Sequence, residues 1–218
     1  MTYTFNEKVS TPLCEIMGRN QTDKGHANIS ESWHNYTTFY YSIFKERTQD
    51  QLRIFELGLG TNNTKFACNM GEGGRPGASL YGWAEFFPRA TLYGADIDSE
   101  ILFNTDRIST FYCDQTDPTI IKQMWEEPAL ADAFDIIIED GLHTFAANVC
   151  FFENSIHKLK RTGYYIIEDL VTSTIPLYTA KIKTWNVKYP DLVFTILQIP
   201  SKNRIDNNLL VVRYKVLG

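Results

Sequence analysis

Two short segments end strand-like apolar runs in carboxylates: residues 138–143 (IEDGLH) and 166–170 (IIEDL). Burying an unpaired carboxylate beside an apolar strand costs free energy, so such groups usually meet a cation, a donor or water. We expect the two strands to be neighbours, about 4.8 Å apart. Asp140, Glu168 and Asp169 would then converge on one ion, and oxygen ligands suit a hard cation such as Mg²⁺. A cation there could chelate two vicinal hydroxyls and lower the pKa of one.

A histidine lies close to the first of these carboxylates. His143 follows Asp140 by three residues, where we expect a helix to begin, so both side chains should share one face. A histidine has an ordinary pKa of about 6.5 and can accept a hydroxyl proton near neutrality. We therefore predict His143 as a general base, with Asp140 beside it in the catalytic group. The alternative is that His143 only caps the helix and packs there.

The third informative segment is a strand pattern that breaks into glycines. Residues 53–61 (RIFELGLGT) contain Gly58 and Gly60, which would let the backbone approach a ligand closely. A nicotinamide site expects a third glycine soon after and an acid about 20 residues on. Here the next acid at a strand end, Asp96, follows Gly58 by 38 positions. A nicotinamide-dependent oxidoreductase therefore fits poorly.

These features resemble a known family. The motif at 56–60 (ELGLG), Asp96 ending a second strand and 113–115 (CDQ) ending a third resemble the class I S-adenosylmethionine-dependent methyltransferases. More narrowly, 140–143 (DGLH) followed by 167–170 (IEDL) is similar to the metal-dependent sugar O-methyltransferases of the macrolide mycinose pathway.

The resemblance runs from about residue 18 to the end of the chain. It includes residues 22–25 (TDKG), which are similar to the segment that precedes the fold in those relatives. It implies that S-adenosylmethionine lies over the glycine turn, with its ribose on Asp96 or Asp98 and its adenine beside a third strand. The implied cofactor contacts are Lys24, Glu56, Gly58, Gly60, Thr61, Asp96, Asp114 and Gln115.

The implied reaction is Mg²⁺-dependent methylation of a sugar hydroxyl. We expect no counterpart of the large N-terminal domain of the macrolide-acting relatives, and we therefore expect a nucleotide-sugar, a polysaccharide or a glycosylated natural product as the acceptor. We expect the N-terminal segment to form a lid, and the predicted substrate contacts are His34, Tyr36, Arg204 and Asn207. A catechol-type O-methyltransferase is one alternative, but that group takes a lysine as base, and we expect no lysine near Asp140. A non-catalytic S-adenosylmethionine-binding protein is the other.

The elements that must position these residues alternate. Helical patterns, including one at about 35–45 and one at 78–87, separate apolar runs near 53–57, 91–95, 108–112, 134–138 and 163–167, which predicts a mostly parallel sheet with helices on both faces. Runs at 192–199 and 208–214 with a short connector predict an antiparallel hairpin. The resemblance makes this an α/β, Rossmann-like methyltransferase fold with seven strands. We expect an N-terminal helical extension or lid over 1–50 and the methyltransferase domain over 51–218.

Composition limits the remaining options. The chain has 218 residues, enough for one α/β domain, and a net charge of -5 with scattered basic residues, which argues against a nucleic-acid partner. It shows no signal peptide and no long apolar run, so we expect a cytoplasmic protein without a membrane span. Four widely spaced cysteines suit reduced thiols. The aromatic content is compatible with a homo-oligomer.

Overall fold

The computed structural model describes residues 3–215, and its elements follow the alternating pattern of the sequence. The strands are β1 (Arg53–Leu57), β2 (Thr91–Asp96), β3 (Ile108–Tyr112), β4 (Phe134–Glu139), β5 (Leu159–Ile167), β6 (Leu192–Gln198) and β7 (Asn208–Tyr214). The helices are α1 (Pro12–Arg19), α2 (Tyr36–Phe44), α3 (Ala78–Phe86), α4 (Pro118–Trp125), α5 (Phe145–Ser155) and α6 (Ile175–Lys188). Short 3₁₀ turns cover Lys45–Arg47, Ser99–Ile101, Pro128–Leu130, Ile156–Lys158 and Thr172–Thr174.

All seven strands join one sheet in the order β3-β2-β1-β4-β5-β7-β6. The first five pair in parallel, and β7 lies antiparallel between β5 and β6. The predicted mostly parallel sheet with a C-terminal antiparallel hairpin is therefore confirmed. Because β1 and β4 are central neighbours, the glycine turn and the first carboxylate segment leave the sheet side by side.

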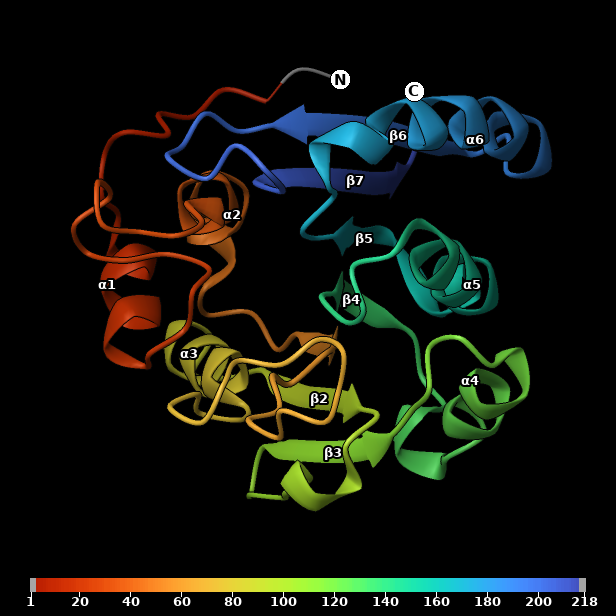
Figure 1. The fold of residues 1–218 in the computed structure, drawn as a ribbon. Helices are drawn as coiled ribbons and strands as arrows, with labels where there is room; N and C mark the ends of the chain where they lie inside the picture. The colour runs from red at the N-terminus through yellow and green to blue at the C-terminus, as the bar shows by residue number, and fades with distance from the viewer. Residues whose placement is uncertain (1–2, 216–218) are drawn as a thin grey trace.

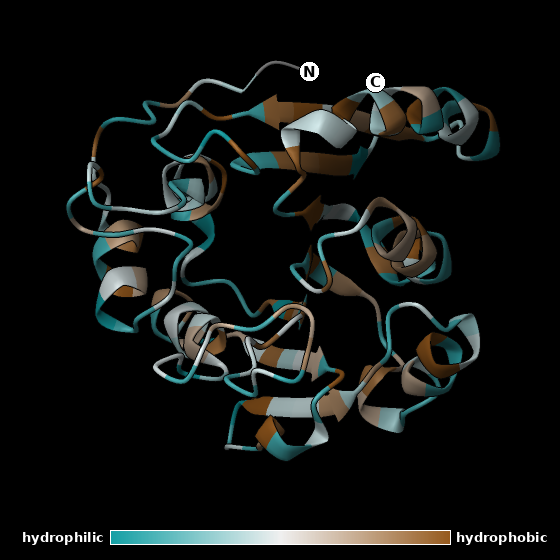
Figure 2. Cartoon of the chain, viewed as in Figure 1, coloured by the Kyte–Doolittle hydropathy of each residue, from teal (hydrophilic) through white to brown (hydrophobic). Residues whose placement is uncertain are grey.

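Helices cover both faces of the sheet, with α1, α2 and α3 on one side and α4, α5 and α6 on the other (Figure 1). Alternate residues of the central strands supply the two apolar layers: Ile137 packs with the second group of helices, whereas Ile136 and Ile138 pack with the first. Figure 2 shows hydrophobic strands between more hydrophilic loops. A strand that is buried on both faces has a continuous apolar sequence, so these strands could be predicted from hydrophobicity.

The fifth strand begins earlier than its apolar run. The sequence predicts a strand near 163–167, but β5 starts at Leu159, and the β4–β5 register shifts between Phe134 and Ile136. Arg161 and Thr162 are exposed in this early part of the strand. Hydrophobicity did not reveal this part, because only Leu159 of these early residues pairs with β4 and enters the core, and the polar residues 160–162 separate it from the apolar run.

The N-terminal helices share a core with the sheet. Leu13 of α1 and Phe39 of α2 belong to the same buried cluster as Ile54 of β1 and Leu209 of β7. The boundary near residue 50 stays a prediction, and residues 1–2 and 216–218 of the two expected units lie outside the described range. Within that range, no helix has the length and apolar character needed to cross a bilayer.

A charged cluster joins α5 to α6. The Glu153 carboxylate accepts hydrogen bonds from Trp185 Nε1 at 2.9 Å and from Lys188 Nζ at 2.9 Å, and Lys181 Nζ lies 2.8 Å from its Oε1. Partial burial alone would raise the pKa of Glu153, but these donors lower it to about 2. The carboxylate therefore stabilises the folded chain most above its unfolded pKa of about 4.3, and this contribution disappears as the pH falls through about 2.

The variant Glu153→Gln tests this link between the helices. We expect it to lower the free energy of unfolding by about 1–2 kcal/mol at pH 7, less than the pKa shift alone would give because the side chain is partly solvated. The difference from wild type should shrink between about pH 4.5 and pH 2, as measured by urea denaturation. Glu126→Gln, at a carboxylate 64% exposed, is the control and should cost less than about 0.5 kcal/mol. A pH-independent difference would contradict the assignment.

Candidate active site

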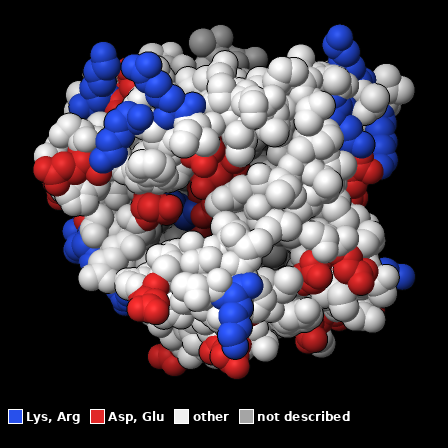
Figure 3. Space-filling view, in the orientation of Figure 1, with Lys and Arg blue, Asp and Glu red and all other residues white. Residues whose placement is uncertain are grey.

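A cavity of about 590 Å³ opens at the carboxyl ends of β1, β2, β4 and β5, where open α/β sheets bind their ligands. Figure 3 shows acidic side chains gathered at a hollow on the viewed face. The loop between β1 and α3 forms one wall of this cavity. The lining includes Asp23, Gly58, Gly60, Thr61, Phe66, Cys68, Met70, Asp96, Asp114, Gln115, Asp140, His143 and Asp169.

The glycine turn follows β1 at the base of this cavity. Gly58 has φ +88°, and a Cβ built there would lie 1.9 Å from the carbonyl oxygen of Asp140. The backbone of the β1 turn thus runs directly against the turn after β4. Only a glycine can occupy this position without moving one of the two turns, which explains the residue type that the sequence pattern singled out.

The two acids after β2 are both buried. Asp96 accepts hydrogen bonds from the backbone N–H of Leu59 at 2.7 Å and of Asp98 at 2.9 Å, and it lines the cavity. Burial raises the pKa of Asp96. Asp98, the other possible ribose partner, is 3% exposed and accepts a hydrogen bond from Thr61 Oγ1 at 2.5 Å. Asp96 is the better candidate for a ligand contact.

Gln115 fixes the turn after β4. Its Nε2 donates to Glu139 Oε1 at 2.9 Å, and its Oε1 accepts from the backbone N–H of Leu142 at 2.6 Å. Burial raises the pKa of Glu139 to about 8, so this carboxyl is mostly protonated at neutral pH. Both ends of the Gln115 amide are therefore occupied within the protein, a role that its position in the sequence did not reveal. Asp114 lines the cavity and accepts hydrogen bonds from Thr116.

A buried lysine holds three carboxylates together. Lys24 is 2% exposed; its Nζ contacts Asp140 Oδ2 and Glu168 Oε2 and lies 3.2 Å from Glu56 Oε1. Tyr40 donates to the other oxygen of Glu168. Burial alone would lower the pKa of Lys24, but the three carboxylates raise it well above its ordinary value. The expectation that no lysine is near Asp140 is wrong, because Lys24 contacts it. The two residues are 116 positions apart in the sequence, so local spacing could not reveal the contact.

Lys24 also differs from its predicted role at the cofactor. Its side chain does not line the cavity and points into the carboxylates beneath it. Glu56, another predicted cofactor contact, is fully buried and accepts a hydrogen bond from Trp83 Nε1 at 2.8 Å. Both side chains therefore act in the structure as a buried ionic support for the cavity wall.

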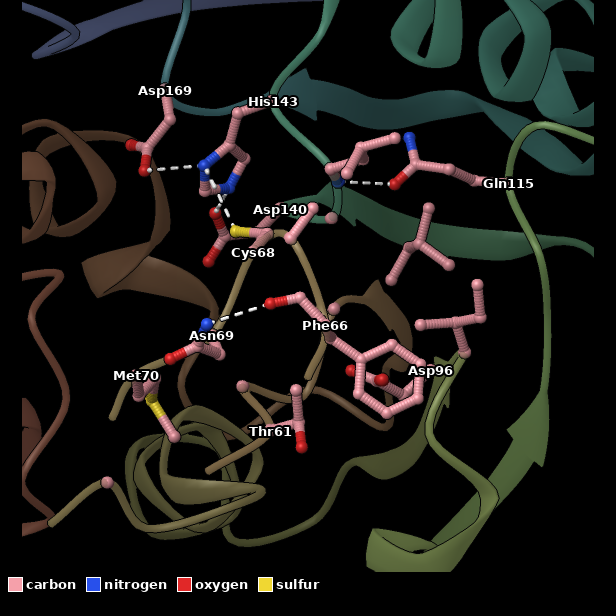
Figure 4. A pocket seen from close by; sticks show the side chains of 18 of the residues that line it. Thr61, Phe66, Cys68, Asn69, Met70, Asp96, Gln115, Asp140, His143 and Asp169 are labelled. Atoms are coloured by element: carbon pink, nitrogen blue, oxygen red, sulfur yellow. Dashed lines mark hydrogen bonds and ion pairs between the residues drawn. The ribbon is translucent and has the colours of Figure 1, made fainter. Parts of the chain in front are cut away.

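Asp140, His143 and Asp169 meet at the cavity surface. His143 Nε2 lies 3.0 Å from Asp140 Oδ1, and its Nδ1 lies 3.6 Å from Asp169 Oδ2 and 3.7 Å from Cys68 Sγ (Figure 4). Each residue of the acid–histidine–acid trio offers a ligand atom within 4.8 Å of the others. Burial alone would lower the pKa of His143, but its hydrogen bonds with Asp140 and Cys68 and the nearby carboxylates raise it well above 6.5.

The local backbone differs from the expected helix start. His143 has φ +59°, and α5 begins only at Phe145, with Thr144 as its N-cap. The predicted pairing of His143 with Asp140 therefore occurs in a turn, and the helical reason given for it is wrong. Asp169 also has positive φ, +53°. Left-handed backbone is uncommon for residues other than glycine, although Asp and His adopt it more readily than most, and it is frequent at functional sites.

Three predicted substrate contacts lie behind Asp169. Tyr36 Oη is 2.7 Å from Asp169 Oδ1, and His34 stacks on the Tyr36 ring with its Nε2 3.6 Å from the same oxygen. Asn207 Oδ1 lies 3.2 Å from His34 Nδ1. All three side chains are buried and do not line the cavity. They position Asp169, whereas Arg204 is exposed on the loop between β6 and β7.

Of the three predicted metal ligands, Asp140 and Asp169 face a common point in the cavity and Glu168 does not. Asp140 and Asp169 face the same surface of the cavity, and burial and the charge of Asp140 raise the pKa of Asp169 to about 6. Glu168 is 1% exposed, and both of its oxygens are taken by Lys24 and Tyr40. Two of the three oxygen donors therefore fit a hard cation directly. Glu168 could bind the same ion only if the Lys24 ammonium group moved away from the Glu168 carboxylate.

Comparisons with known proteins come from sequence and from structure. No family model matches the chain. It is 32% identical over 146 residues to an 8-demethyl-8-(2-methoxy-alpha-L-rhamnosyl)-tetracenomycin-C 3'-O-methyltransferase of Streptomyces olivaceus, covering 67% of this chain and 35% of that protein. It is 32% identical over 180 residues to an L-olivosyl-oleandolide 3-O-methyltransferase of Streptomyces antibioticus, covering 80% of this chain and 41% of that protein. The chain thus spans well under half the length of these curated relatives.

A solved structure shows the same architecture. The MycE methyltransferase from the mycinamycin biosynthetic pathway, in complex with Mg and SAH, matches with a TM-score of 0.69 at 23% identity. The match covers 95% of this chain and 55% of that chain. At this level of identity the match shows the fold, which extends over nearly all of the present chain.

Proposed function

Because the chain belongs to the class I S-adenosylmethionine-dependent methyltransferase fold family and is similar in sequence to sugar O-methyltransferases, we propose that it methylates a sugar hydroxyl. The acceptor is a sugar carried by a larger natural product, as the names of the relatives indicate for those proteins. The observation that carries this proposal is the convergence of Asp140, His143 and Asp169 on one wall of a cavity that also contains the glycine turn.

The cofactor would be S-adenosylmethionine, which supplies an electrophilic methyl group when bound. Gly58 and Gly60 give its amino-acid part access to the backbone of the turn, beside Thr61. Asp96 offers carboxylate oxygens to the ribose hydroxyls, and Asp114 lies at the expected adenine end. Gln115 supports this end by holding the turn after β4, because its own amide is already paired.

His143 is the proposed general base. In the proposed tautomer Nε2–H of His143 donates a hydrogen bond to Asp140, which orients the ring and leaves Nδ1 as the nitrogen that can take a hydroxyl proton. The histidine must be neutral to do this, whereas the two carboxylates favour its charged form. Mg²⁺ held by Asp140 and Asp169 would supply charge that offsets those carboxylates and acidifies the acceptor hydroxyl.

A catechol-type enzyme with a lysine base is the competing function. Lys24 is close enough to Asp140 to raise this option, but it is buried and paired with three carboxylates that keep it protonated. A base must be neutral and must reach the acceptor, and Lys24 does not line the cavity. These two facts favour His143 and the sugar reaction.

Calorimetric titration of metal-stripped protein tests the proposal. We expect S-adenosylhomocysteine to bind, and we expect a separate Mg²⁺ isotherm that is lost in Asp140→Ala. The exposed acid Asp132 provides a matched control, and Asp132→Ala should retain both isotherms. Failure to bind S-adenosylhomocysteine would remove the methyltransferase assignment. Cofactor binding with a Mg²⁺ isotherm unchanged in Asp140→Ala would remove only the metal assignment.

A further inference from the structure

An exposed tryptophan lies near the rim of the cavity. Trp33 is 50% exposed and belongs to neither of the two buried apolar clusters. The three other tryptophans of the chain are at most 5% exposed: Trp83, Trp125 and Trp185. The residue after Trp33, His34, donates its backbone N–H to the carbonyl oxygen of Asp23, and Asp23 lines the cavity. Neither the core nor the proposed methyl transfer uses the indole.

A second exposed apolar side chain comes from the loop between β6 and β7. Ile205 is 60% exposed, and its backbone N–H donates to Asn203 Oδ1 at 3.0 Å. Asn203 Nδ2 lies 3.5 Å from His34 Nδ1, and the Trp33 indole meets the edge of the same His34 ring, with ring centroids 6.2 Å apart. Single exposed apolar side chains are ordinary, but here two distant segments bring one each to the surface around one buried histidine.

This surface adjoins the reacting groups. His34 Nε2 lies 3.6 Å from Asp169 Oδ1, so one imidazole ring separates the indole of Trp33 from that carboxylate. The other oxygen of Asp169, Oδ2, lies 3.6 Å from Nδ1 of His143, the proposed base. An acceptor whose hydroxyl is held between His143 and Asp169 therefore has the rest of its body within reach of Trp33.

The size of the cavity determines which part of an acceptor reaches that surface. Pockets of about 300–1,000 Å³ enclose one drug-sized ligand, and the present cavity has a volume of about 590 Å³. The cofactor and one sugar ring together fill a cavity of this size. A larger body attached to the sugar must therefore lie outside the cavity, against the protein surface. An apolar body gains free energy there by covering exposed apolar side chains, whereas a hydroxyl-rich sugar gains much less.

We propose that Trp33 and Ile205 form an aglycone-binding surface, which contacts the apolar part of the acceptor beyond the sugar that is methylated. The inference rests on the proposed function and deepens it, because it assigns selectivity for the acceptor to residues outside the cavity. The indole is planar and rigid, so it loses little conformational entropy when an apolar group covers it. Covering about 100 Å² of apolar surface, roughly the exposed part of the indole, is enough for at least about a tenfold gain in affinity.

Two glycosides that differ only in their apolar part test this surface: octyl rhamnoside and methyl rhamnoside, rhamnose being the sugar named for one relative. In calorimetry with S-adenosylhomocysteine present, we expect wild-type protein to bind the octyl glycoside at least about tenfold more tightly. Trp33→Ala should reduce this preference to less than about threefold and raise KM for the octyl glycoside, while kcat for both glycosides stays within about twofold of wild type. Trp33→Phe should retain most of the preference, because it keeps an aromatic ring.

Intrinsic fluorescence follows the same contact directly. Because the other three tryptophans are buried, acrylamide quenching of wild-type protein reports mainly on Trp33. The octyl glycoside should protect this fluorescence from quenching, and the methyl glycoside should not. Tyr112→Ala is the matched control: this tyrosine is 47% exposed on β3, which three strands separate from β5. That variant should keep the wild-type preference and the wild-type protection.

The same samples separate this inference from the proposed function. Absence of the preference in wild type, or its persistence in Trp33→Ala, overturns the aglycone-binding surface. A fall in kcat for both glycosides in Trp33→Ala also overturns it, because the indole would then act only as support for His34 and Asp169. Protection of the fluorescence in a protein that transfers no methyl group would leave the surface intact and reject the methyltransferase. Methyl transfer to both glycosides with equal KM would reject the surface alone.

Discussion

Replacing Lys24 with methionine is expected to lower the free energy of unfolding by about 3–5 kcal/mol, the largest stability effect that we predict. The substitution keeps an apolar side chain of similar length but leaves Glu56, Asp140 and Glu168 without their shared counter-charge. The raised pKa of Lys24 means that its contribution is fully present below its unfolded pKa of about 10.4 and is lost only as the pH rises beyond that value. Urea denaturation at pH 7 measures the difference.

Two further variants make this result specific. Lys122→Met removes a lysine that is 77% exposed and should cost less than about 0.5 kcal/mol. Adding Glu168→Gln to Lys24→Met removes one of the stranded charges and should restore part of the lost stability. A loss below about 1 kcal/mol in the single variant, or additive losses in the double variant, would show that the cluster is not held by its lysine.

The second large effect concerns turnover. His143→Gln should reduce the rate of methyl transfer by about 10²- to 10⁴-fold, the usual contribution of a general base, because glutamine cannot accept the hydroxyl proton. Affinity for S-adenosylhomocysteine should change little, because the glycine turn and Asp96 are untouched. Steady-state assays with rhamnosylated and olivosylated acceptors, chosen from the names of the relatives, together with calorimetry provide the two readouts.

His157 provides a control for the general effect of replacing a histidine with glutamine. His157 is exposed and lies outside the cavity, so His157→Gln should keep wild-type turnover. Near-wild-type turnover of His143→Gln at saturating acceptor, across the pH range, would contradict the base assignment. Loss of cofactor affinity in that variant would point to a structural role in the turn.

The fold was predictable from sequence because its central strands are continuous apolar runs. β1 and β3 have the predicted bounds, and the C-terminal hairpin follows from two runs with a short connector. The early part of β5 was missed because the polar residues 160–162 separate Leu159, which pairs with Phe134, from the apolar run at 163–167. Local patterning thus identifies continuous buried strands well, and it misses strand residues that polar positions separate from the apolar run.

The site was predictable where its residues end strands. Asp140 and Asp169 follow β4 and β5, and adjacent parallel strands bring their carboxyl ends together. Lys24 and Tyr36 could not be assigned in the same way, because they come from the N-terminal segment and reach Asp140 and Asp169 across 116 and 133 positions. Such contacts depend on tertiary packing, which no local pattern encodes. Cys68 was considered only as one of four dispersed thiols.

The contacts behind Asp169 also bear on the order in which the site forms. Tyr36 lies against both Asp169 and the backbone of Asp206, and His34 against Asn207, so the early part of the chain meets the loop before β7. During synthesis, β1 to β5 emerge before this loop and can begin to pair as each parallel strand appears. The contacts of Tyr36 with Asp206 and of His34 with Asn207 must wait until residue 207 has left the ribosome. A nascent chain that ends after β5 would thus contain the strands that carry the carboxylates, yet it could not complete the support of Asp169.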